Sequence, residues 1–203
     1  ILFGSLVVPA LFFENVLEPI IFLANLASGV LLLSKLPKFM WLCIGLLIIN
    51  SLALAITTVF HEQSMVLEFV RVGSYFLFYL IVTFEIIRQI WDVKKVSKNV
   101  IFGLTSGYLS LGLLGFFICL GVEMVHPHSF DGGLLAIHED LEIRTEQLMY
   151  YSFVTLMTIG YGDILPITDL AQKASLLIGL VGQFYMVIIT AVVVGKFINQ
   201  RNG

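Results

Sequence analysis

The stretch from Thr158 to Asp163 reads Thr-Ile-Gly-Tyr-Gly-Asp and lies between two apolar segments, residues 100–122 and 171–198, that are each long enough to cross a bilayer. Glycines on both sides of a tyrosine allow an extended backbone in which successive carbonyl groups point the same way. Four copies of such a stretch around one axis would stack the carbonyl oxygens into rings that can replace the water shell of a cation. The chain holds one copy, so the pattern predicts a homotetramer.

Composition places the chain among membrane proteins. Of its 203 residues, 59% are hydrophobic and only 12% are charged, and the mean hydropathy is +0.99. These values lie outside the range of soluble globular domains, so they exclude a soluble enzyme and predict an all-α integral membrane protein surrounded by lipid. No catalytic constellation is visible, and we expect neither a cofactor nor a nucleic-acid partner.

Polar residues and prolines divide the chain into six apolar segments that we expect to be transmembrane helices: residues 1–13, 16–33, 39–60, 66–91, 100–122 and 171–198. One long helix over residues 1–33 is the alternative, but its length of about 50 Å exceeds a bilayer core of about 30 Å. A half-length re-entrant helix, residues 145–157, is expected to end at Thr158. We therefore expect a four-helix membrane domain over residues 1–98 and a pore domain over residues 99–203.

The distribution of charge predicts the orientation in the membrane. If the six helices alternate strictly, eight of the eleven Lys and Arg residues fall on one side and twelve of the fourteen Asp and Glu residues fall on the other. Because cytoplasmic loops carry the positive excess, both termini are expected in the cytoplasm and the Thr158–Asp163 stretch at the outer face. The expected location is the plasma or inner membrane, with several passes.

From Leu148 to Ile198 the sequence closely resembles the pore module of tetrameric potassium channels: it contains Y-Y-S-F-V-T-L-M-T-I-G-Y-G-D-I-L-P and then an inner helix with a glycine twenty positions beyond Gly162. Small prokaryotic channels with six helices per subunit are the nearest general match. The resemblance covers about the last hundred residues if residues 100–122 form the outer helix. It implies passive, K⁺-selective conduction through a selectivity filter, with K⁺ at the carbonyls of Thr158, Ile159, Gly160 and Tyr161, and with Gly162 closing the filter. A weakly selective cation channel, a subunit of a K⁺ uptake transporter and a nonconducting sensor or scaffold remain as alternatives.

The resemblance also implies residues that support the filter. Thr155 matches a pore-helix threonine behind the filter, and Asp163 matches a carboxylate that family members bond to the pore helix. Several positions depart from the common pattern: Val154, Met157, Tyr150 and Tyr151. Because Tyr150 and Tyr151 replace a common tryptophan pair, we hypothesise that the Tyr151 hydroxyl bonds Asp163.

The last apolar segment carries the candidates for a cavity and a gate. Gly182 matches the family's hinge glycine, although a packing role is an equal alternative. Gln183 and Thr190 share one face of a straight α-helix, and polar side chains within a bilayer usually face protein or water. The candidate residues of the cavity and gate are Gly182, Gln183, Met186, Thr190, Val194 and Ile198. Bonding of the two polar residues to neighbouring helices is the alternative.

The fourth segment does not have the repeated arginines of a voltage sensor. It holds only Arg71 and Arg88, each with a glutamate three positions before it, Glu68 and Glu85. We interpret these as local ion pairs and expect no strong voltage gating, because each gating charge contributes only about 2.3 kcal/mol per 100 mV.

The loop before the pore helix combines histidines with acidic residues: His126, His128, Asp131, His138, Glu139, Asp140, Glu142 and Glu146. An acidic vestibule that concentrates cations is the favoured interpretation. A sensor of pH or of a transition metal is the alternative, since histidine titrates near neutrality and binds such metals.

Overall fold

The computed structural model describes residues 37–60, 65–93, 95–136 and 141–202. The chain forms two compact units, Ile1–Phe78 and Tyr79–Gly203. The first two predicted helices, residues 1–13 and 16–33, lie outside the described residues. The other four apolar segments are confirmed as helices.

In the first unit, α3 spans Pro37–Phe60, and α4 begins at Met65 and continues to Asp92 in the second unit. Polar side chains of this unit bond carbonyls one turn earlier in their own helix. The Asn50 amide donates to the Leu46 carbonyl over 2.9 Å, and the Ser74 hydroxyl donates to the Val70 carbonyl over 2.7 Å. Such bonds allow a polar residue to lie in an apolar helix without a partner elsewhere.

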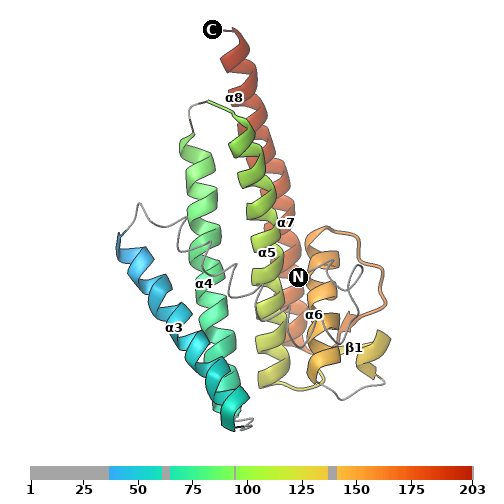
Figure 1. Cartoon of the computed structure of the whole chain (residues 1–203). Coiled ribbons are helices and arrows are strands. Elements are labelled where there is room, and N and C mark those ends of the chain that lie inside the picture. The colour runs from blue at the N-terminus through green and yellow to red at the C-terminus, as the bar shows by residue number, and fades with distance from the viewer. Residues whose placement is uncertain (1–36, 61–64, 94, 137–140, 203) are drawn as a thin grey trace, which may run out of the picture. The chain divides into compact units, whose positions relative to one another are not determined.

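The second unit contains α5 (Lys98–Val125), the half-length helix α6 (Leu141–Leu156) and α7 (Asp169–Phe184). A π-helical turn, η5 (Tyr185–Ile189), joins α7 to α8 (Thr190–Asn202) without a break in the helix. The short strands β1 (Phe130–Asp131) and β2 (Leu165–Pro166) pair antiparallel, and a 3₁₀ turn, η4 (Gly133–Ala136), follows β1. Helices α5, α6 and α7 all contact one another (Figure 1), so α6 is held by the two long helices.

Three of the described helices are long and apolar enough to cross a membrane: Met65–Asp92, Val100–Val125 and Asp169–Gln200. The apolar part described for α3, Phe39–Ala53, is shorter than a full span. The helix predicted for residues 145–157 begins four residues earlier, at Leu141, and ends at Leu156. Its 16 residues are too few to cross a bilayer.

Two glycines on α5 allow close contact with α6. A Cβ atom on Gly112 would lie 2.1 Å from a ring carbon of Phe153, and one on Gly115 would lie 2.6 Å from the Ser152 hydroxyl. The Ser152 hydroxyl in turn donates to the Gly112 carbonyl over 2.8 Å. Small residues thus let the two backbones approach until a side chain of α6 can bond the backbone of α5.

The π-helical turn changes the faces of the inner helix, which is formed by α7, η5 and α8. Because a π turn contains one residue more than an α turn, the residues after it are rotated by one residue step, about 100°. The prediction that Gln183 and Thr190 share a face was wrong for this reason, since the turn Tyr185–Ile189 separates them. Both side chains are exposed on the single chain.

The phenol of Tyr185, in the π turn, attaches the inner helix to α5. Its hydroxyl donates to the Leu104 carbonyl over 2.7 Å, and its ring lies 5.7 Å from that of Tyr108. A Cβ atom on Gly107 would lie 2.5 Å from the Tyr185 hydroxyl, so this glycine leaves room for the phenol. The inner helix is therefore bonded to α5 at the position of its irregular turn.

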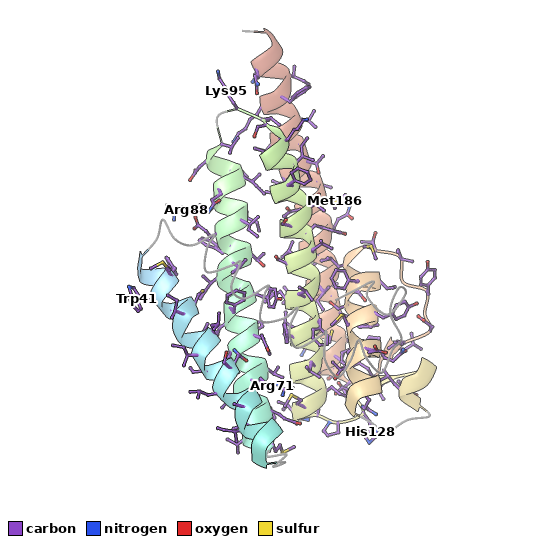
Figure 2. All side chains as sticks on the ribbon, viewed as in Figure 1. Trp41, Arg71, Arg88, Lys95, His128 and Met186 are labelled. Carbon is purple, nitrogen blue, oxygen red and sulfur yellow. The ribbon has the colours of Figure 1, made fainter. Side chains whose placement is uncertain are left out.

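The basic end of α5 is opposite the end that carries the loop histidines. Figure 2 shows Lys95 before one end of α5 and His128 after the other. At the Lys95 end, the Gln200 side chain accepts from the Val96 backbone N–H over 2.9 Å, and the Lys196 ammonium donates to the Trp91 carbonyl. The end of α8 therefore contacts the connection between α4 and α5.

The predicted ion pairs of α4 form only in part. Arg88 lies 3.6 Å from the Glu85 carboxylate and 3.9 Å from that of Asp92, so the interpretation of Arg88 as a local pair is confirmed. Within residues 65–92 no ion pair joins Glu68 to Arg71, so that part of the interpretation was wrong.

Candidate ion-conducting site

The filter candidate begins in the C-terminal cap of α6. The Thr158 N–H donates to the Thr155 carbonyl over 3.0 Å, and the Ile159 N–H donates to the Val154 carbonyl, also over 3.0 Å. With Thr158 at φ +58°, these two bonds form a Schellman motif, which usually requires glycine at this position. A β-branched residue with positive φ is uncommon and strained. The sequence therefore places a threonine where the helix end alone would favour glycine.

Beyond this cap the sign of φ alternates along the chain. Thr158, Gly160 and Gly162 have positive φ angles of 58°, 59° and 79°, whereas Ile159 and Tyr161 do not have positive φ. An ordinary extended strand turns successive carbonyls to opposite sides, and alternation between left- and right-handed backbone turns them to the same side instead. The two glycines supply left-handed positions that side chains disfavour. The alternating signs of φ from Thr158 to Gly162 are those that such a same-side arrangement of carbonyls requires.

The side chains of this segment are exposed on the single chain. Tyr161 is 69% exposed, and Ile159 and Met157 are each nearly half exposed. Aromatic and aliphatic side chains at such exposure beside a membrane helix indicate a surface that another chain or lipid covers.

The carboxylate of Asp163 is bonded by Tyr150, not by Tyr151. The Tyr150 hydroxyl donates to Asp163 Oδ2 over 2.7 Å. This bond is the main reason that the pKa of Tyr150 is raised above its ordinary value, because the bond favours the neutral phenol. The hypothesis that Tyr151 bonds Asp163 was therefore wrong by one residue, since consecutive residues on a helix point about 100° apart.

Tyr151 instead attaches α6 to α7. Its hydroxyl lies 2.6 Å from the Ser175 hydroxyl, which donates to the Ala171 carbonyl and therefore accepts from Tyr151. Its ring lies 5.1 Å from that of Phe130 in β1. Burial is the main cause of the raised pKa of Tyr151. This tyrosine fixes α6 against α7 and β1.

One C-terminal carbonyl of α6 is also bonded from α5. The Tyr108 hydroxyl donates to the Leu156 carbonyl over 3.2 Å. A Cβ atom on Gly182 would lie 2.4 Å from the same carbonyl oxygen, so Gly182 is a packing contact between the inner helix and the end of α6. The other cavity and gate candidates, Gln183, Met186, Thr190, Val194 and Ile198, are all exposed on the single chain, and Figure 2 labels Met186 on the inner helix.

Sequence reasoning missed a buried ion pair that joins the end of α5 to the start of α6. Glu123 and Arg144 are 6% and 8% exposed, and the guanidinium donates to the carboxylate. The same carboxylate accepts from the backbone N–H groups of His128, Ser129 and Phe130 at 2.8, 2.9 and 3.3 Å. The residues are 21 positions apart, so only the unusual presence of an arginine in an acidic loop could have indicated the pair.

In the outer loop, the backbone is hydrogen-bonded, whereas several charged or titratable side chains are exposed. His126, His128 and Asp131 are exposed, whereas residues 137–140 lie outside the described part. Within the described residues, no group of three or more His, Cys, Asp or Glu side chains could hold a metal ion. The loop backbone is held by Glu123 and by the pairing of β1 with β2.

Residues 129–199 match the sequence model of a protein family described as "Ion channel". The chain carries an ion channel domain in this segment. The matched segment includes β1, α6, the filter candidate and most of the inner helix, and it covers about a third of the chain. No curated protein and no solved structure shows a significant match to the chain.

Proposed function

We propose that the protein is a potassium-selective channel that conducts K⁺ passively through a homotetrameric filter. The observation that carries the proposal is the alternating backbone from Thr158 to Gly162, which starts at the end of a half-length helix inside an ion channel domain. Four such segments around one axis would present rings of carbonyl oxygens to a dehydrated cation.

The surroundings of the filter candidate support a tetramer. Tyr161 has a large aromatic side chain that is 69% exposed on the single chain. In the proposed assembly a neighbouring subunit covers this ring, and the ring then holds the filter at constant width. The exposed positions of the inner helix, among them Met186 and Val194, would line the cavity or contact neighbouring subunits.

The proposed mechanism uses the end of α6 and the filter in sequence. The partial negative charge at the C-terminus of α6 favours a cation in the inner cavity, although Tyr108 already bonds one of the last carbonyls. K⁺ then exchanges water for the carbonyls of Thr158, Ile159, Gly160 and Tyr161, and for the Thr158 hydroxyl. Repulsion between ions in neighbouring sites keeps them moving. Conduction requires no chemical step.

Reversal potentials test this proposal directly. Purified protein in planar bilayers, with K⁺ on one side and Na⁺ on the other, should show a reversal potential far from zero, with the sign that opposes K⁺ flow. A reversal near zero would indicate the weakly selective cation channel, and no current at all would favour the nonconducting sensor. Either result contradicts the proposal.

A pair of alanine variants separates the filter from general effects of glycine replacement. Gly160 and Gly121 both have open space where a Cβ atom would go, but only Gly160 has a positive φ, of 59°. Gly160→Ala should therefore abolish K⁺ selectivity, whereas Gly121→Ala in α5 should leave the reversal potential unchanged. Equal behaviour of the two variants would contradict the role of the alternating backbone.

A further inference from the structure

The outer loop contacts the exit of the filter candidate through one glycine. Gly132 has φ +106° and follows β1 directly. A Cβ atom at this position would lie 2.3 Å from the Asp163 carbonyl oxygen and 3.2 Å from its carbonyl carbon. Because these are backbone atoms, they cannot move aside as a flexible side chain could. The loop backbone therefore lies directly against the last residue of the Thr158–Asp163 stretch.

Several bonds fix Gly132 in this place. Asp131 Oδ1 accepts from the Gly132 N–H over 2.8 Å, and Asp131 pairs with Leu165 across the two strands. The Ile167 N–H donates to the Ser129 carbonyl over 2.9 Å just beyond the strand pair. The segment that leaves the filter and the loop that precedes the pore helix are thus one bonded layer.

Asp163 is consequently held from two sides. Tyr150 of the pore helix bonds its carboxylate, and Gly132 of the outer loop packs against its carbonyl. The first contact can be lost without moving the backbone, whereas the second opposes displacement of the backbone itself.

We propose that Gly132 is a positioning residue for the filter: it holds the Asp163 carbonyl, and with it the outer end of the filter, in the conducting conformation. This inference rests on the proposed function of the filter. The outer loop then acts as a part of the filter structure and not only as an acidic surface above it.

A neighbouring glycine provides a matched control. Gly133 also has a positive φ, of 57°, but the nearest atom to a Cβ there would be the end of the flexible Gln147 side chain, at 3.3 Å, and the Asp163 carbonyl oxygen would lie at an ordinary van der Waals distance of 3.8 Å. Gly132→Ala and Gly133→Ala therefore both introduce alanine into left-handed backbone of the same loop. Only the first variant pushes on the backbone of Asp163.

Hydrogen exchange of the purified full chain, followed by mass spectrometry of peptides covering residues 157–165, measures the effect without requiring current. Gly132→Ala should speed amide exchange in these peptides by about tenfold, as expected when strain of this kind lowers the cost of local opening. In bilayers the same variant should lose K⁺ current faster during sustained opening. Gly133→Ala should alter exchange only in the loop peptides. Equal exchange of the filter peptides in both variants would overturn the proposal.

Variants of Asp131 keep the proposal testable if Gly132→Ala does not fold. Asp131→Ala removes the acceptor for the Gly132 N–H, and Asp131→Asn removes the charge but keeps an acceptor oxygen. Exchange in residues 157–165 should rise for Asp131→Ala and remain unchanged for Asp131→Asn. A rise of equal size in both would assign the effect to charge and contradict the role of Gly132.

The reversal potential of the wild-type protein tests the proposed function separately. The wild type could conduct no K⁺-selective current while Gly132→Ala still speeds amide exchange in residues 157–165. In that case the proposed function is wrong, but the contact of Gly132 with Asp163 still positions this segment. If the wild type selects K⁺ and the two glycine variants behave alike, only the inference on Gly132 fails.

Discussion

Replacing Arg144 with methionine should destabilise the protein less than replacing Glu123 with methionine. In Arg144→Met the Glu123 carboxylate keeps three backbone N–H donors, so its charge stays bonded. We expect a cost near the lower limit for breaking a buried pair, about 3 kcal/mol. Glu123→Met leaves a buried guanidinium and also removes the acceptor of those three N–H groups, so we expect at least about 5 kcal/mol.

Thermal unfolding of the purified protein in detergent, followed by fluorescence, measures this order. Arg88→Met is the matched control, because Arg88 is exposed and lies 3.6 Å from its partner. The Arg88 guanidinium is exposed, and the buried Glu85 carboxylate still accepts from the Gln89 amide over 3.1 Å in the variant, so we expect a cost of only about 1 kcal/mol. The midpoint should therefore fall slightly for Arg88→Met, more for Arg144→Met and most for Glu123→Met. If Arg144→Met unfolds at the same temperature as Arg88→Met, the reasoning about this buried pair is wrong.

Three further results are expected around the filter candidate. In bilayer recordings, Tyr150→Phe should accelerate inactivation because it removes the bond to Asp163, whereas Tyr151→Phe should leave the rate unchanged; the reverse order would contradict the observed bonding. The bond to Asp163 raises the pKa of Tyr150 above 10.0, so it stabilises the folded protein below pH 10, and this contribution is lost as pH rises through the raised pKa. The wild type should therefore lose stability at alkaline pH for this reason, whereas Tyr150→Phe should not. Gly182→Ala places a Cβ atom 2.4 Å from the Leu156 carbonyl and should lower the yield of folded protein on size-exclusion chromatography, whereas normal yield with altered open probability would favour a hinge.

The sequence was sufficient for the helices that long apolar runs define. The segments over residues 66–91, 100–122 and 171–198 form helices that end within a few residues of the predicted limits. Lipid favours helices strongly, because every backbone polar group must be bonded within the segment, so hydropathy alone locates them. The half-length helix was predictable because polar loop residues and the glycine-containing stretch limit it on both sides.

The contacts around the filter depend on directions that a single sequence does not reveal. Tyr150 and Tyr151 are adjacent and chemically identical, and only the packing of α6 on α7 decides which phenol reaches Asp163 and which reaches Ser175. Likewise, the ion pair of Glu123 with Arg144 joins two helix ends through a loop whose conformation no local pattern specifies.

The π-helical turn at Tyr185–Ile189 corresponds to one inserted residue in an otherwise α-helical segment. Deletion of one residue from this turn would restore α geometry and rotate every position from Thr190 to Asn202 by about 100° about the helix axis. A different set of side chains would then face the axis of the proposed pore, although none of them had been substituted. The spacing of residues in this turn therefore determines the lining of the inner end of the pore together with the identity of the side chains.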